Sequence, residues 1–237
     1  LTASAQRHRR FVAEYFGVTH YEPPMPLSTG GEAEAAPSHL SCLSKYDVDA
    51  LRRYTGIFQD REMVMVTEKI HGANSRFAYF DGRMWCGSRT EWKRQTEGNA
   101  WWRALASTPA IEEFCRAHEG HVLYGEIYGD VQSLRYGCKK GEIRFAAFDT
   151  LLPDGTWLDA EQNRILLALG NIPQVPLLAI MPYSFEAVCA FAEGKSTMLG
   201  ADHVREGCVV KPLAERWHQA IGRVCLKVVG AGYLETA

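Results

Sequence analysis

The chain has 237 residues, of which 46% are apolar and 11% aromatic, so it can bury a substantial core and is not a disordered protein. Its 26 basic and 28 acidic residues give a net charge of −2, which excludes a broadly basic protein but permits a local basic groove. Seven scattered cysteines without a Cys-x-x-Cys pair argue against a disulfide scaffold and a zinc site, and favour a reducing intracellular compartment, cytoplasmic or nuclear.

Residues 1–44 have the composition of a tail followed by a linker. A basic cluster and the apolar residues after it predict a short amphipathic helix that ends at Gly17. Residues 21–41 are rich in proline and glycine, as linkers are. Because the first residue is Leu1 rather than methionine, we expect the tail and linker of a missing upstream domain, in preference to a nucleic-acid-binding arm. The globular domain is then expected over residues 45–237.

The first half of this expected domain contains clear turn and cap signals. Asp47 matches the N-cap of a short helix over residues 48–54. The dipeptide Asp81-Gly82 predicts a hairpin turn between two strands, and Pro109 predicts the start of a helix. The expected elements are strands over residues 63–68, 74–80, 83–86 and 121–127, and helices over residues 99–106 and 110–118.

The second half continues the irregular alternation. Asp159 matches the N-cap of a helix that Gly170 ends. The expected elements are strands over residues 143–148, 175–180, 206–211 and 222–229, and helices over residues 160–169 and 185–193. Hairpins and irregular order favour an α+β fold with largely antiparallel sheets over a doubly wound fold. No apolar run reaches transmembrane length, and no signal peptide is recognisable.

The apolar, β-branched run at 63–68 delivers Lys69 to a turn at Gly72. A lysine amine has an ordinary pKa of about 10.4, so it becomes a nucleophile only where burial or neighbouring cations lower that pKa. We expect the strand end to supply the burial, and a second lysine or a metal to supply the charge. Gly72 would permit a tight turn and leave room for a ligand. The pattern Lys-x-x-Gly is weak alone, because it recurs at Lys227–Gly230 and a surface lysine explains it equally well.

Later blocks give this lysine a context. Residues 67–74 read Thr-Glu-Lys-Ile-His-Gly-Ala-Asn. The blocks that follow are Ser88-Arg89, Gly125-Glu126-Ile127-Tyr128-Gly129, Phe145-Ala146-Ala147-Phe148-Asp149, Glu206-Gly207-Cys208-Val209-Val210-Lys211 and Leu226-Lys227-Val228-Val229. This series resembles the covalent nucleotidyltransferase superfamily of ATP-dependent ligases and capping enzymes, and Glu-Lys-Ile-His-Gly-x-Asn is similar to its RNA-ligase branch. The resemblance, from about Tyr46 to Tyr233, implies a nucleotidyltransferase (ATP-grasp-like ligase adenylation) fold with largely antiparallel sheets flanked by helices.

The resemblance implies roles for the residues around the lysine. Lys69 would attack the α-phosphate of ATP, expel pyrophosphate and hold AMP through a phosphoramidate. The backbone at Glu68 would meet the adenine edge, with Ile70 on the other side of Lys69. His71 and Asn74 would lie near the phosphate or its metal.

The nucleoside would be held by residues from three further blocks. Arg89 presents a fork of donors suited to ribose and phosphate oxygens. Glu126 would accept hydrogen bonds from the ribose hydroxyls, and Phe148 would stack on the adenine face. Period-2 alternation places Phe145 and Phe148 on opposite faces of their strand, so only one of them can line the pocket.

The phosphate end would be held by the last two blocks. Glu206 would coordinate a divalent cation, Mg²⁺ or Mn²⁺, or its water. Lys227 would stabilise charge on the α-phosphate and help to lower the pKa of Lys69, and Lys211 could do similar work. Many RNA ligases have Lys-x-Lys in the last block, whereas this chain has Cys225 in place of the first lysine.

The stretch Gly194-Lys195-Ser196-Thr197 imitates the end of a phosphate-binding P-loop. The glycine that would open such a loop falls at Cys189, and a helix rather than a strand precedes the turn. We therefore interpret this stretch as an exposed turn.

The nucleic-acid partner is indicated by two further segments. Residues 17–24 and 131–137 resemble the RNA ligases that carry an N-terminal oligonucleotide-binding barrel, which would lie upstream of Leu1. In that subgroup the substrate is a nicked duplex with RNA on the 3′-OH side. Trp101 and Trp102 are first interpreted as the core and rim of a helix. Possible contacts with the duplex are Trp92, Lys93, Arg94, Trp101 and Trp102.

The sequence thus predicts an ATP-dependent RNA ligase, a monomer that joins 3′-OH and 5′-phosphate ends through a lysyl-AMP intermediate, as in nick sealing or RNA repair. Two alternatives stay open. One is a capping-type guanylyltransferase, which would prefer GTP. The other is a ligase-like module that binds nucleic acid without catalysis, which Cys225 keeps possible.

Overall fold

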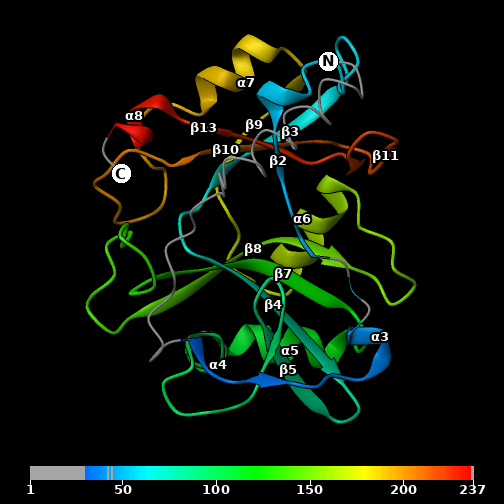
Figure 1. Ribbon diagram of the computed structural model, residues 1–237, viewed down its shortest axis with the longest axis vertical. Helices are drawn as coiled ribbons and strands as arrows, with labels where there is room; N and C mark the ends of the chain where they lie inside the picture. The colour runs from blue at the N-terminus through cyan, green and yellow to red at the C-terminus, as the bar shows by residue number, and fades with distance from the viewer. Residues whose placement is uncertain (1–29, 42, 44, 236–237) are drawn as a thin grey trace, which may run out of the picture.

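A computed structural model describes residues 30–41, 43 and 45–235 of the chain, and the helix expected before Gly17 lies outside these residues. Two sheets lie one above the other, with most of the longer helices on their outer sides (Figure 1). The six-stranded sheet has the order β1-β6-β5-β4-β7-β8, and the five-stranded sheet has the order β2-β13-β10-β3-β9. Between named strands, β2 and β13 form the parallel pair and the other pairs are antiparallel. The predicted α+β class with largely antiparallel sheets is confirmed.

The elements of the six-stranded side come mainly from the middle of the chain. Asp81 and Gly82 have φ values of 52° and 75°, which fit the tight hairpin turn predicted between β4 and β5. The strands are β1 (Ala33–Glu34), β4 (Ala73–Phe80), β5 (Arg83–Gly87), β6 (Trp92–Lys93), β7 (Val122–Gly129) and β8 (Ile143–Leu151), and the helices are α3 (Ser38–Ser41), α4 (Ala100–Ser107), α5 (Pro109–Ala117) and α6 (Ala160–Leu169).

The five-stranded side combines β3 with elements from the C-terminal third. Its strands are β2 (Asp49–Ala50), β3 (Met63–Lys69), β9 (Leu177–Pro182), β10 (Gly207–Pro212) and β13 (Leu226–Val229), and a short 3-10 helix follows β2 (Leu51–Arg53). The remaining elements are α7 (Phe185–Phe191), the small hairpin β11 (Trp217–His218) with β12 (Gly222–Arg223), and α8 (Ala231–Leu234). None of the helices in the described part of the chain is long and apolar enough to cross a membrane.

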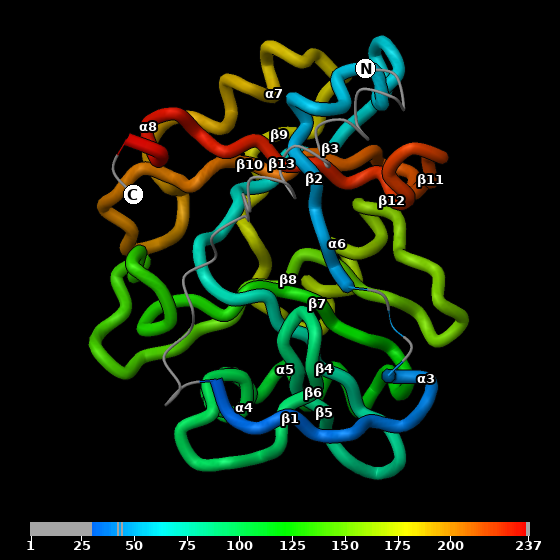
Figure 2. Tube along the Cα trace, in the orientation of Figure 1, coloured from blue at the N-terminus to red at the C-terminus, as the bar shows by residue number. Residues whose placement is uncertain are grey.

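Each sheet buries its outer face against helices. Phe77, Leu123 and Phe145 of the six-stranded sheet pack in one core with α4, α5 and α6. Val66, Val210 and Leu226 of the five-stranded sheet pack in a second core with α7. Because side chains alternate along a strand, the residues between these positions face the space between the two sheets. The chain crosses from one sheet to the other at residues 70–72 (Figure 2).

Several expectations differ from the structure. Residues 48–54, expected as a helix, form β2 and one 3-10 turn, because Asp49–Ala50 pairs with Leu226–Lys227. Asp47 does not cap a helix; its carboxylate accepts a hydrogen bond from Arg89 at 2.9 Å. The strand expected over residues 222–229 is divided into β12 and β13.

Two further differences concern caps and the linker. Asp159 precedes α6 without capping it, and its carboxylate instead accepts from the backbone N–H of Glu215 at 2.6 Å. Part of the expected linker packs on the domain. Leu40 is fully buried, its carbonyl accepts a hydrogen bond from Trp92 Nε1 at 3.0 Å, and β1 pairs with β6.

Candidate active site

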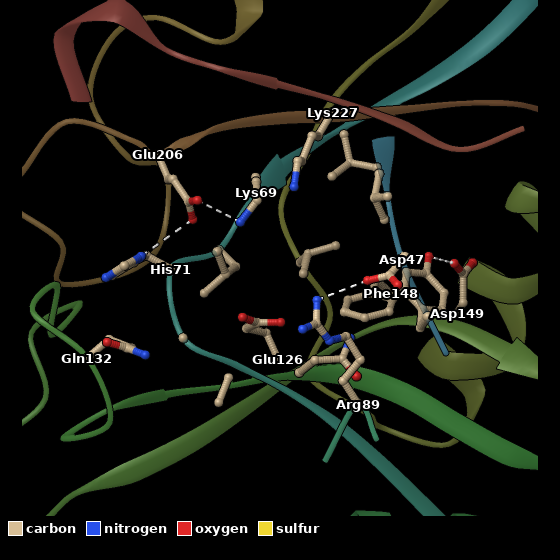
Figure 3. A pocket seen from close by; sticks show the side chains of 18 of the residues that line it. Asp47, Lys69, His71, Arg89, Glu126, Gln132, Phe148, Asp149, Glu206 and Lys227 are labelled. Atoms are coloured by element: carbon tan, nitrogen blue, oxygen red, sulfur yellow. Dashed lines mark hydrogen bonds and ion pairs between the residues drawn. The ribbon is translucent and has the colours of Figure 1, made fainter. Parts of the chain in front are cut away.

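A cavity of about 800 Å³ lies between the two sheets, and Figure 3 shows side chains pointing into it from both. The register of the strands explains why these residues lie close together. Asn74 lies opposite Glu126 on one sheet, whereas Lys69 lies opposite Gly207 on the other. The structure brings every sequence-predicted site residue to the lining of this cavity: Glu68, Lys69, Ile70, His71, Asn74, Arg89, Glu126, Phe148, Glu206, Lys211 and Lys227.

Lys69 is held in an ion pair at the end of β3. Its Nζ lies 2.7 Å from Glu206 Oε1, because Gly207 is the register partner of Lys69. Burial alone would lower the pKa of Lys69, but the carboxylates of Glu206 and Glu126 outweigh burial and leave that pKa raised. Lys227 points toward the same space (Figure 3). The sequence led us to expect burial and cations to lower the pKa of this amine, whereas the neighbouring carboxylates raise it.

We expect Glu206→Gln to lower the pKa of Lys69, because it removes the carboxylate that most favours the charged amine. An amine-reactive label, quantified at Lys69 by mass spectrometry across pH, should then react at a lower pH than in the parent protein. Asp47→Asn is the matched control, since Asp47 is an exposed cavity carboxylate paired with Arg89 instead. An unchanged labelling profile in Glu206→Gln would contradict this account of the ion pair.

His71 joins the ion pair to helix α8 and to the loop between β7 and β8. Its Nδ1 lies 3.2 Å from the Tyr233 hydroxyl and 3.7 Å from Glu206 Oε2, and its Nε2 lies 3.2 Å from Ser133 Oγ. Its backbone N–H donates to the Tyr136 hydroxyl at 2.6 Å. Tyr233 and Tyr136 were not assigned from the sequence, because their partner is 162 and 65 residues away along the chain.

Glu206 is the residue in the cavity that is best suited to hold a divalent cation. Within the described residues no group of three or more His, Cys, Asp or Glu side chains converges as a metal cluster. Glu206 Oε2 is nevertheless buried and lacks a hydrogen-bond partner among those residues. A magnesium-type cation keeps several waters and is commonly held by one or two carboxylates together with substrate phosphate. A single carboxylate of this kind fits that mode of binding.

The other end of the cavity is suited to a nucleoside. Phe148 lines the cavity, whereas Phe145 lies in the helix-covered core, as the alternation predicted. The pairing of β7 with β8 shifts register beside Phe148, between Tyr124–Asp149 and Gly125–Ala147.

Two polar residues stand beside this aromatic ring. Arg89 donates to Asp47 at 2.9 Å, across from the ring (Figure 3). Burial raises the pKa of Glu126 to about 8, because the opposing influence of Lys69 is smaller. Burial therefore favours the protonated form of the Glu126 carboxyl.

Lys211 is engaged elsewhere than expected. Its Nζ forms an ion pair with Asp149 and donates to the Phe148 carbonyl at 3.2 Å. Arg223 contacts the same carboxylate, with Nη1 2.9 Å from Asp149 Oδ2, and the Tyr46 hydroxyl donates to it as well. Lys211 thus anchors the strand that carries Phe148. Tyr46 and Asp149 line the cavity but were not assigned from the sequence.

Glu68 points away from the cavity, although its backbone lines it. Its carboxylate accepts hydrogen bonds from Ser196 Oγ and from the N–H and Oγ1 of Thr197, the last two at 2.7 Å. The stretch 194–197 is largely exposed, as interpreted, but Ser196 and Thr197 also bind the buried carboxylate of Glu68. A Cβ on Gly72 would lie 2.1 Å from the Ile127 carbonyl, so close approach of β7 explains this glycine.

Asn74 and the tryptophans extend the site toward α4. The Asn74 carbonyl accepts from Trp101 Nε1 at 3.1 Å, and Asn74 Oδ1 is buried without a hydrogen-bond partner in the described part of the chain. Trp101 is buried in the core and Trp102 packs at its rim, as interpreted. Trp92 is buried too, so it is not a surface contact for nucleic acid. Arg94 remains exposed and Lys93 lines the cavity.

Comparisons with known proteins agree with this architecture. The sequence profile of the RNA ligase family matches residues 62–229. The solved structure of a Naegleria gruberi RNA ligase with PPi is similar, with 26% identity and a TM-score of 0.79 over 95% of this chain and 66% of the ligase.

Two variants of the Naegleria gruberi ligase match similarly. One was solved with ATP and Mn, at 25% identity and a TM-score of 0.77, and the other with AMP and Mn, at 25% identity and a TM-score of 0.79; 95% of this chain and 67% of each ligase chain are covered in both comparisons. This chain therefore spans about two thirds of the length of that ligase. Among curated proteins, none matches the sequence significantly.

Proposed function

This chain belongs to the RNA ligase family, and on that premise we propose that it carries out ATP-dependent nucleotidyl transfer through Lys69. The observation that carries the proposal is the position of the Lys69 amine, at a strand end inside a cavity whose other walls supply Glu126, Phe148, Glu206 and Lys227. The solved structure of a Naegleria gruberi RNA ligase variant with ATP and Mn supports the choice of ATP as nucleotide and of a divalent metal.

The chemistry proceeds in three transfers. Lys69 Nζ loses a proton and attacks the α-phosphorus of ATP, so a P–N bond forms while the bond to the pyrophosphate oxygen breaks. An oxygen of a 5′-phosphate then attacks the same phosphorus, the P–N bond breaks, and the Lys69 amine takes up a proton as it leaves. Finally a 3′-hydroxyl attacks the activated 5′-phosphorus, a phosphodiester forms, and AMP departs. We propose a nicked duplex with RNA on the 3′-OH side as substrate.

Different residues would bind different parts of ATP during the transfer of AMP to Lys69. Phe148 would stack on the adenine, and Arg89 and Glu126 would meet the ribose. Lys227 would face the α-phosphate and offset the charge that builds on its oxygens. Glu206 would hold a divalent cation, Mg²⁺ or Mn²⁺, whose charge would stabilise the phosphate oxygens and weaken the hold of the carboxylate on the lysine proton.

The proposal is tested by incubating the protein with ATP and Mg²⁺ or Mn²⁺ and analysing it by mass spectrometry. We expect an AMP adduct that peptide mapping places on Lys69. Labelled GTP serves as the competing substrate, because efficient transfer of GMP would support the capping-type alternative instead. A folded protein that forms no adduct with either nucleotide would contradict the proposal and leave the binding-module alternative.

Sealing is tested separately on nicked duplexes with either RNA or DNA at the 3′-OH side. We expect joining of the RNA-containing nick, although the chain spans only 66% of the Naegleria gruberi ligase. We also propose an intracellular, monomeric enzyme. Six described cysteines are free thiols, which is typical of a reducing compartment.

A further inference from the structure

The backbone around Lys69 is anchored on both sides by loops that lie outside the strands of the two sheets. On the N-terminal side, Thr197 and Ser196 hold the carboxylate of Glu68, which is 1% exposed. On the C-terminal side, the Tyr136 hydroxyl accepts the backbone N–H of His71 at 2.6 Å. The nucleophile therefore lies between two fixed points, one residue before it and two residues after it.

Tyr136 adopts a conformation that ordinary residues avoid. Its φ is 50°, in the left-handed region, and its side chain is 1% exposed. A bulky residue keeps such a backbone only where the surrounding structure imposes it, and such outliers concentrate at functional sites. Here the conformation directs the ring toward the crossover between the two sheets, where its hydroxyl meets His71.

The two loops that carry the anchors also contact each other. Residues 130–142 join β7 to β8 of the six-stranded sheet, and residues 192–206 join α7 to β10 of the five-stranded sheet. A Cβ on Gly137 would lie 2.6 Å from the Gly200 carbonyl, and the rings of Tyr136 and His203 meet edge to face at 4.6 Å. Figure 2 shows the loops meeting at one side of the molecule. The contact therefore links the two sheets beside the cavity.

We propose that these two loops form a clamp, defined by Tyr136, Gly137, Ser196, Thr197 and Gly200, which sets the Lys69 amine in line with the phosphorus. Tyr136 and Thr197 are its positioning residues. The proposal rests on the proposed function of Lys69. In-line attack tolerates little displacement, and a misplacement of about 1 Å costs on the order of 100-fold in rate. The clamp acts on the reacting atom through the backbone on either side of Lys69.

Tyr136→Phe removes only the hydroxyl that accepts the His71 N–H. We expect the single-turnover rate of AMP transfer to Lys69 to fall by about 10- to 100-fold, while the apparent affinity for ATP changes by less than about threefold. Rates are measured across ATP concentrations at a temperature well below the unfolding midpoint of each protein. A structural role alone would lower the unfolding midpoint and leave the rate per folded molecule unchanged.

Tyr128→Phe is the matched control. Tyr128 is buried in the same cluster, with its ring 5.4 Å from that of Tyr136, and its hydroxyl interacts with Arg144 instead of His71. We expect this variant to transfer AMP at the parent rate. Equal rates for Tyr136→Phe and Tyr128→Phe would overturn the clamp while the AMP adduct of the parent upholds the proposed function. Absence of the adduct in the parent would overturn both.

Thr197 tests the other anchor. Thr197→Val removes the Oγ1 donor to Glu68 and keeps the backbone N–H, so we expect a loss of about 3- to 10-fold in the same rate, as for one hydrogen bond. Thr197→Ser retains a hydroxyl and should restore the rate. A parent-like Thr197→Val, or a Thr197→Ser as slow as Thr197→Val, would overturn the part of the clamp assigned to Glu68.

Discussion

Lys69→Ala is expected to abolish the AMP adduct, with a fall in the rate of ATP-dependent transfer of at least about 10³-fold. The variant removes the one amine at the end of β3 that faces both Glu206 and the space between the sheets. The protein should remain folded, because the substitution shortens a cavity-lining side chain and leaves the helix-covered cores intact. Intact-protein mass spectrometry after incubation with ATP and Mn²⁺ measures the adduct.

Two further substitutions make this result specific. Lys69→Arg keeps a cation opposite Glu206, but a guanidinium stays protonated and cannot attack, so it should also fail to form the adduct. Lys140→Ala removes an exposed lysine outside the cavity and should behave as the parent. If Lys69→Ala formed the adduct or sealed nicks as well as the parent, Lys69 would not be the nucleophile and the binding-module alternative would gain ground.

The strands that build the cavity were predictable because their signals are local. β3, β4, β5, β7 and β8 are apolar runs bounded by turn residues, and Asp81-Gly82 forms the expected hairpin. β2 was not predictable, since its residues follow a cap-like Asp47 and form a strand only by pairing with Leu226–Lys227, far along the chain. Tertiary pairing overrides local preference in such short strands.

In the candidate site, too, features with a local sequence signal were predictable and features set by distant contacts were not. The expected site residues could be placed from ordered blocks, but Tyr46, Asp149 and Tyr233, which also line the cavity, could not, and neither could the pairing of the charged groups. Lys69 was expected among cations, whereas the pairing of Gly207 with Lys69 places the carboxylate of Glu206 against the amine. The Ser196–Glu68 contact spans 128 residues and the Tyr46–Asp149 contact spans 103. Contacts of this range carry no local sequence signal.

Asp149→Asn is expected to lower the free energy of unfolding by about 3–5 kcal/mol. The substitution breaks a buried ion network, because it removes the carboxylate that Lys211 and Arg223 share. Asp149 is 1% exposed, and Arg223 Nη1 lies 2.9 Å from its Oδ2 while Lys211 pairs with its Oδ1. The amide would lack the negative charge that Lys211 and Arg223 share, although Arg223 would keep its ion pair with Glu215. Urea denaturation at neutral pH, with parent and variant compared, measures the difference.

The pH dependence gives this prediction a sign. Although Asp149 is buried, Arg223 and Lys211 hold the pKa of its carboxyl well below the usual range. In the unfolded chain the same carboxyl has a pKa of about 3.9. A carboxyl whose pKa is lower in the folded state stabilises the fold at pH values above its pKa in the unfolded chain. This stabilisation is lost as the pH falls toward the pKa in the folded state. The parent should therefore lose stability below about pH 4 more steeply than Asp149→Asn.

Asp47→Asn is the matched control for the Asp149 prediction. Asp47 also pairs with an arginine, at 2.9 Å from Arg89, but its side chain is 63% exposed. Water screens such a pair, so the substitution should cost no more than about 1 kcal/mol and leave the acid limb unchanged. Similar losses for Asp47→Asn and Asp149→Asn would show that the buried network contributes no more than a surface pair. The strand that carries Phe148 would then owe its stability to its pairing with β7 and its apolar packing.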